Sequence, residues 1–135
     1  MMTNKCSKTG SLTLLDIQTK ADPCPLQKGA TSNHVVTFDN QRGDNLYDVV
    51  ILVGSYGKSV EFPGSQTPTE RRHEESVVPA GSSDYKLPMQ ASQGKSALAD
   101  EITTSIAFYD STQKMPAGYW GEKEGTSIKY TLNIQ

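Results

Sequence analysis

Few side chains in this sequence have the types and spacing that bond-making chemistry requires. His34 and His73 lie far apart, and neither has a cysteine or carboxylate at metal-ligand spacing. Glu74 and Glu75 are adjacent, so in an extended or loop backbone they point apart and form no acid and base pair. No Ser, His and Asp arrangement is evident, although such triads form in space and not in sequence. We therefore expect no metal site, no cofactor and no enzymatic activity.

Residues 52–59 end in Gly57-Lys58-Ser59, like a phosphate-binding loop. The first glycine of that motif would stand at position 52, where this chain has leucine. A phosphate-binding loop must also open a helix, and the sequence Val-Glu-Phe-Pro-Gly that follows cannot continue as one. The stretch therefore predicts a hairpin turn.

Arg42-Gly43-Asp44 spells an adhesive tripeptide at a position where a turn would display it. Glycine and aspartate are also ordinary turn formers, so the match alone carries little information. Residues 70–75 form a run of charges within a polar stretch and predict a solvated face.

The two cysteines, Cys6 and Cys24, fit a single disulfide that closes a loop of about 19 residues and contributes roughly 3 kcal/mol. They fit two free thiols equally well. The first five residues contain no apolar stretch, so the sequence as given carries no signal peptide. Either the protein is cytosolic, or the sequence is a mature form to which methionines were added.

The length of 135 residues predicts one domain over residues 1–135. A net charge of -2, with lysine and arginine scattered along the chain, offers no basic patch for nucleic acid. The longest apolar run, residues 49–53, is strand-sized and far below the roughly 20 residues that cross a bilayer. We expect no nucleic-acid partner and no transmembrane segment.

Alternation of apolar and polar residues is far more frequent in this chain than helical spacing. It predicts strands over residues 11–18, 33–39, 58–62, 83–89 and 127–134. A nearly continuous β-branched run bounded by turn residues predicts a further strand, buried on both faces, over residues 46–53. The turn at residues 54–57 predicts that the strands on either side of it form a hairpin. Residues 63–76 are too polar to bury and are expected to form a surface loop.

Residues 97–110 fit two patterns. The helical pattern is a stripe through Leu98, Ile102, Ile106 and Tyr109. The strand pattern is a face through Ile102, Thr104, Ile106 and Phe108. Two adjacent threonines favour the extended structure. Seven or so short strands without a convincing helix predict an all-β fold, a two-sheet immunoglobulin-like β-sandwich.

Residues 24–29, Cys-Pro-Leu-Gln-Lys-Gly, and the following Val35-Val36-Thr37-Phe38 resemble the opening of the ML (MD-2-related lipid-recognition) family, in particular its Niemann-Pick type C2 sterol-binding members. Cys6, with Gly10 after it, is similar to the upstream part of that pattern. The resemblance continues to Val60-Glu61-Phe62-Pro63, which is similar to the family's V-x-F-P segment. Members of this type usually carry three disulfides, whereas this chain has two cysteines.

The resemblance implies a lipid-binding or lipid-transfer protein that holds a sterol, fatty acid or phospholipid between its two sheets. It implies that Val60, Phe62 and Pro63 lie at the pocket mouth, and Phe62 is the expected gate. From alternation alone we add candidates to line the space between the sheets, each of which would otherwise be plain core: Val49, Ile51, Tyr85, Leu87, Ile106 and Phe108. The implied compartment is the cell exterior or the lumen of an endolysosome or the endoplasmic reticulum.

The alternative hypothesis is an immunoglobulin-like protein-interaction module. In its K-G and terminal-strand layout the chain resembles the luminal domain of the translocon-associated protein alpha subunit. Such a module would bind a protein partner through an edge strand or an exposed loop. A lipid carrier predicts a bound lipid in an organic extract, whereas an interaction module predicts capture of another protein.

Overall fold

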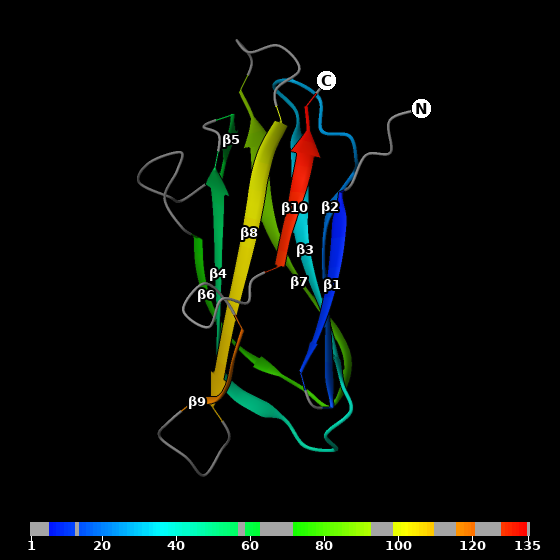
Figure 1. The fold of residues 1–135 in the computed structure, drawn as a ribbon, viewed down its shortest axis with the longest axis vertical. Helices are drawn as coiled ribbons and strands as arrows, with labels where there is room; N and C mark the ends of the chain where they lie inside the picture. The colour runs from blue at the N-terminus through cyan, green and yellow to red at the C-terminus, as the bar shows by residue number, and fades with distance from the viewer. Residues whose placement is uncertain are drawn as a thin grey trace.

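The computed structural model describes residues 6–12, 14–56, 59–62, 72–92, 99–109, 116–120 and 128–134. Within these ranges the chain forms strands joined by turns, and no helix is present that could cross a membrane. Two antiparallel sheets face each other, with their strands along the long axis in Figure 1. The expected all-β, two-sheet immunoglobulin-like sandwich is confirmed.

The first sheet has the strand order β1-β2-β3-β7-β5, and the second has the order β10-β8-β4-β6, with β9 also pairing with β8. The strands are β1 (Ser7–Leu12), β2 (Leu15–Asp22), β3 (Thr31–Asn40), β4 (Leu46–Tyr56), β5 (Val60–Glu61), β6 (Arg72–Val78), β7 (Gly81–Ala91), β8 (Ala99–Tyr109), β9 (Pro116–Trp120) and β10 (Ile128–Asn133).

The segment that fitted two patterns is a strand. β8 pairs antiparallel with β4 on one side and with β10 on the other. Ile102, Thr104 and Ile106 are all fully buried between the sheets, which is the spacing of a strand face. β-branched residues at these positions favour the extended backbone, so the strand pattern was the correct one.

The first predicted strand, residues 11–18, is wrong because it spans a turn. β1 ends at Leu12 and β2 begins at Leu15, and the two pair as a tight antiparallel hairpin. Leu14 makes the turn with a φ of 58°, and its carbonyl accepts a hydrogen bond from the Gln41 amide (2.9 Å). Leucine gives no turn signal in the sequence, which is why alternation continued through it.

The predicted hairpin between residues 46–53 and 58–62 is also wrong. β4 continues to Tyr56, and β5 belongs to the other sheet, where Val60 pairs with Ala91 and Glu61 with Gln90. The chain therefore crosses between the sheets at the point where a tight turn was expected. Residues 57 and 58 lie outside the described part of the chain.

The predicted surface loop over residues 63–76 overlaps β6 at residues 72–76, and β6 pairs antiparallel with β4. His73, which we expected in a loop, lies in this strand. β6 is the last strand of its sheet among the described residues, and an edge strand accepts charged residues that a central strand would exclude. Residues 63–71 lie outside the described part of the chain.

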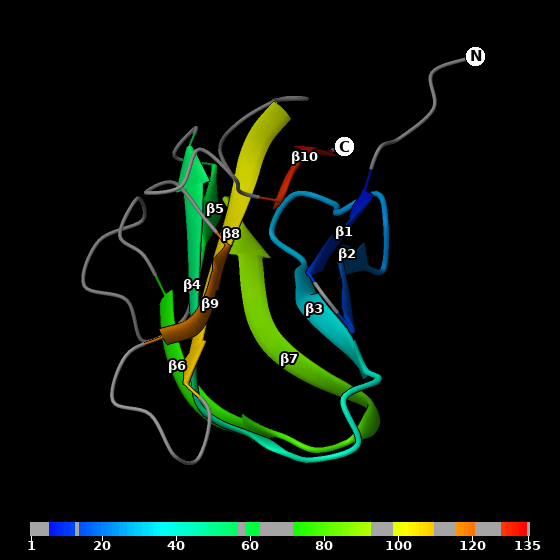
Figure 2. The same ribbon diagram turned by 60° about the horizontal axis from the view of Figure 1, so that its bottom comes forward.

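One long strand pair connects the two sheets. β3 and β7 pair as far as Asn40 and Gly81, and the same two stretches of chain pair again as β4 and β6, starting at Leu46 and Val78. Figure 2 shows both stretches turning together from one sheet into the other. Gly81 has a φ of 88°, a left-handed conformation that glycine adopts without strain.

The buried side chain of Asn40 holds this bend. Its Nδ2 donates to the carbonyl oxygens of Asp44 (2.9 Å) and Pro79 (3.3 Å). Its Oδ1 accepts from the amide of Arg42 (3.0 Å). One side chain thus satisfies backbone groups on both strands where the ladder is interrupted, as buried polar groups require.

A disulfide between Cys6 and Cys24 closes the β1 side of the sandwich, with the two Cα atoms 6.3 Å apart. The Cys6 carbonyl also accepts a hydrogen bond from the Ala21 amide (2.8 Å), and Leu26 forms a parallel bridge with Ile134. The disulfide and the Ala21–Cys6 bond join the residue before β1 to β2 and the segment after β2, and the bridge joins that segment to the residue that follows β10.

Replacing both Cys6 and Cys24 by serine should lower the free energy of unfolding by about 3 kcal/mol, because the disulfide reduces the number of conformations that the loop can adopt in the unfolded chain. Urea denaturation of the oxidised protein and the double variant measures the difference. Equal stability of the two proteins, or no change on adding a reductant to the oxidised protein, would contradict this expectation.

Replacing Leu14 by asparagine should stabilise the protein by about 1 kcal/mol, because leucine resists positive φ and asparagine tolerates it. The side chain is 54% exposed, so little packing is lost. Thermal unfolding measures the gain. The control is Val77→Asn, at a 46% exposed position within β6, which should not stabilise the protein.

Candidate functional site

The side chains predicted to bind lipid pack as core between the two sheets. Val49, Ile51, Val60, Phe62, Leu87 and Ile106 are each at most 2% exposed. Tyr85 is partly buried and packs against the same core. Pro63 and the side chain of Phe108 lie outside the described part of the structure.

Phe62, the expected gate, contacts a buried polar cluster. Its ring meets His34 edge-on, with centroids 6.4 Å apart. His34 Nδ1 lies 2.6 Å from the Tyr130 hydroxyl, and His34 Nε2 lies 2.9 Å from Thr104 Oγ1. The His34 and Tyr130 rings stack at 5.6 Å. Both ring nitrogens are thus hydrogen-bonded across the core, from β3 to β8 and β10.

Burial controls the protonation of this cluster. It lowers the pKa of His34 from 6.5 to about 3, because a charged imidazole loses its hydration there. Burial likewise raises the pKa of Tyr130 above its ordinary value of 10.0. His34 is therefore neutral at physiological pH and joins the sheets as one donor and one acceptor. Both residues are buried on the inner faces of β3 and β10, and only their pairing in space shows the cluster, which the sequence did not predict.

A second buried polar group links β8 to the chain that enters β5. Asp100 Oδ2 accepts hydrogen bonds from Ser55 Oγ and from the Ser59 amide, each at 2.9 Å. Ser59 directly precedes β5, so this carboxylate fixes the crossing between the sheets. Neither this group nor any other set of residues in the described ranges has the three ligands of a metal site.

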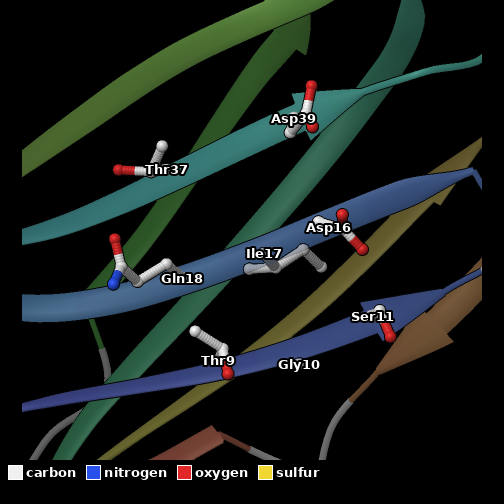
Figure 3. A pocket seen from close by; sticks show the side chains of 8 residues that line it. All are labelled: Thr9, Gly10, Ser11, Asp16, Ile17, Gln18, Thr37 and Asp39. Carbon is white, nitrogen blue, oxygen red and sulfur yellow. The ribbon is translucent and has the colours of Figure 1, made fainter.

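The outer face of the first sheet carries a shallow polar groove of about 640 Å³ across β1, β2 and β3, shown in Figure 3. Its lining side chains are hydroxyls, amides and carboxylates for the most part: Thr9, Gly10, Ser11, Asp16, Ile17, Gln18, Thr37 and Asp39. Asp16 and Asp39 stand opposite each other on β2 and β3, and Gln41 Nε2 donates to both (3.2 and 3.1 Å). The amide offsets the repulsion of two like charges.

A smaller cavity of about 200 Å³ lies between β1 and β10, lined by Ser7, Lys8, Glu101, Lys129, Tyr130 and Thr131. Lys129 and Glu101 form an exposed ion pair there (3.9 Å). Neither this cavity nor the groove is lined by a residue that we predicted to bind lipid.

The adhesive tripeptide lies in the bend between β3 and β4. Gly43 has a φ of 83°, and both Gly43 and Asp44 are exposed. Arg42 is half-buried, and its amide is fixed by Asn40. The tripeptide therefore belongs to a turn that the fold itself requires.

β7 presents backbone groups without a strand partner along most of one side. β3 pairs with it over residues 81–90, whereas on its other side β5 pairs only with Gln90 and Ala91. Within the described ranges no strand covers that side of residues 81–89. We call this stretch the free edge of β7. Its outward-facing residues include Asp84 and Lys86, both exposed, which alternate with inward-facing Tyr85 and Leu87.

Tyr85 links the free edge of β7 to β6 of the other sheet. Its hydroxyl donates to the Val77 carbonyl of β6, and its ring packs edge-on against Phe38 at 5.6 Å. Tyr85 was predicted to line a lipid pocket, but these contacts place it at the side of the sandwich where β6 is the last described strand of one sheet and β5 pairs with only the end of β7 in the other.

Neither a protein-family profile nor a curated protein sequence matches the chain. Among solved structures, the GAE domain of GGA2p from Saccharomyces cerevisiae is similar, with 8% identity, coverage of 96% of this chain and 97% of that chain, and a TM-score of 0.50. The ASH/PapD-like domain 7 of human CEP192 aligns at 12% identity, 99% and 89% coverage and a TM-score of 0.43. The GAE likeness shows the fold, a β-sandwich, and the site rests on this chain's own residues.

Acid should destabilise the protein through His34. Below pH 6.5 the unfolded chain binds a proton at this residue, whereas the folded chain does not until about pH 3. The contribution of His34 to the free energy of unfolding is therefore complete above pH 6.5. It falls on acidification towards pH 3, by on the order of 4 kcal/mol. Urea denaturation across this range should show a steeper fall for the wild type than for His34→Gln, and parallel curves would contradict the assignment.

Removing the Tyr85 hydroxyl should cost about 1 kcal/mol, because the Val77 carbonyl loses a hydrogen bond while the ring still packs on Phe38. Thermal or urea unfolding of Tyr85→Phe measures the loss. Tyr47→Phe is the matched control, since it removes a hydroxyl from an exposed tyrosine of β4 and should change stability little. An equal effect of the two substitutions would show that the Val77 bond does not stabilise the fold.

Proposed function

We propose that this chain is a protein-interaction module that binds an extended segment of another polypeptide along the free edge of β7. The observation that carries the proposal is the side of residues 81–89 that no strand of the described ranges covers, in a strand that is paired with β3 on its other side. Unpaired backbone groups at a sheet edge are a template for an added strand. Sandwiches of this type host many functions, so the argument rests on this edge and not on the fold.

Proline at position 88 indicates which groups of the edge are available. Proline fits within a strand where its missing N–H would face away from the ladder. Successive residues of a strand direct their backbone groups to opposite sides, so Pro88, Lys86, Asp84 and Ser82 share the outward direction. The backbone of Lys86 and Asp84 is therefore offered to a partner, while Tyr85 and Leu87 pair with β3.

Site-specific crosslinking in an extract of cells that express the protein tests this function. A photo-crosslinking amino acid in place of Lys86 should form an adduct with another polypeptide, which can be a further copy of the chain. The matched control replaces Lys20, which stands on the same outer face in the same cross-strand row, two strands from the edge. Adducts from Lys20 but none from Lys86 would refute binding at the edge.

The lipid-carrier hypothesis and the resemblance to the ML family stay predictions. The buried positions of Val60 and Phe62 are those of core residues, and lipid binding would require them to separate. Native mass spectrometry followed by organic extraction decides the matter. We expect the mass of the chain alone, and a co-purified sterol, fatty acid or phospholipid would favour the carrier. The expectations of no enzymatic activity, no nucleic-acid partner and a luminal or extracellular compartment also stay predictions.

A further inference from the structure

The free edge of β7 is centred on Tyr85. β5 covers the strand from Gln90 onwards, and the other end of β7 is Gly81, so residues 81–89 are the stretch that no described strand covers on this side. A two-fold axis perpendicular to a sheet places one residue of an antiparallel edge strand opposite its own copy, and its neighbours then pair reciprocally. With Tyr85 on that axis, Gly81 stands opposite Met89 of the second copy. This register uses the whole uncovered stretch and stops where β5 begins.

The same register is complementary in charge. It places Asp84 opposite Lys86 of the second copy, and Lys86 opposite Asp84, so the dimer contains this pair twice. Both side chains are exposed on the outer face of the sheet. Opposite charges that stand directly across two strands stabilise their pairing, and like charges oppose it. A shift of the register by two residues would lose both pairings and place either Asp84 or Lys86 opposite its own copy.

The backbone directions fit this register as well. Proline at position 88 indicates that Ser82, Asp84, Lys86 and Pro88 direct their backbone groups away from β3, towards the free edge. In the symmetric register these residues stand opposite one another across the two copies, Asp84 opposite Lys86 and Ser82 opposite Pro88. About six backbone hydrogen bonds then form across the axis, because only the proline nitrogen lacks a hydrogen.

We propose that the partner recognised by the free edge of β7 is a second copy of this chain, joined by antiparallel pairing of the two β7 strands about Tyr85. The first sheets of the two copies then form one continuous sheet. This inference rests on the proposed function in using the same edge, and it adds the identity and register of the bound strand.

Charge exchange at the two outer-face residues tests the register. Sedimentation equilibrium of the purified protein from micromolar to millimolar concentration should show a monomer–dimer equilibrium. Asp84→Lys and Lys86→Asp should each weaken dimerisation roughly tenfold or more, because two attractive pairs become repulsive. An equimolar mixture of the two variants should dimerise again, since each copy then supplies the charge that the other lacks. The double variant Asp84→Lys/Lys86→Asp should also dimerise.

Lys20→Asp is the control, because it makes the same charge change in the same row of the same face, away from the edge, and should leave the dimer intact. Circular dichroism and thermal unfolding establish that every variant is folded. A wild type that is monomeric throughout, or a mixture of variants that stays monomeric, overturns the inference. If the purified wild type is monomeric while crosslinking at position 86 captures a different polypeptide, the partner assignment fails and the proposed function stands.

Discussion

The architecture depends on one antiparallel strand pair that bends from the first sheet into the second. β3 and β7 become β4 and β6 through a bend whose interrupted backbone is satisfied by the side chain of Asn40. Because the same pair supplies both sheets, β6 and the uncovered part of β7 lie at the same side of the sandwich, where Tyr85 bonds to Val77. The site proposed for binding is therefore a consequence of how the sandwich closes.

The core combines apolar packing with buried polar links between the sheets. His34 reaches Tyr130 and Thr104 across the core, and Asp100 fixes the chain that enters β5. Such links are costly to bury, but each satisfied hydrogen bond specifies one alignment of the two sheets. By joining the two sheets they keep the inner faces packed together. Residues that the sequence alone would equally allow to line a pocket are therefore core residues.

The sequence predicted the class of fold and the inner faces of most strands, because alternation depends only on neighbouring residues. The prediction failed where a strand pairs with another strand that is distant in the sequence. β5 follows β4 directly but pairs with β7, and no local pattern distinguishes this from a hairpin. Charged residues led to the prediction of a loop where β6 forms, and Leu14 makes a turn without a turn-forming side chain. The disulfide was one of two open alternatives. The free edge cannot be read from the sequence, because it is defined by how far β5 pairs along β7 among the described strands.

Amide hydrogen exchange along β7 tests the central claim most directly, since protection reports whether each backbone N–H is hydrogen-bonded. In dilute solution the amides of Asp84 and Lys86 should exchange rapidly, while those of Tyr85 and Leu87, paired with β3, exchange slowly. When the edge is occupied at high protein concentration, Asp84 and Lys86 should become protected. Protection of these two amides at the lowest concentration would show that the chain already covers this edge, and would contradict the account.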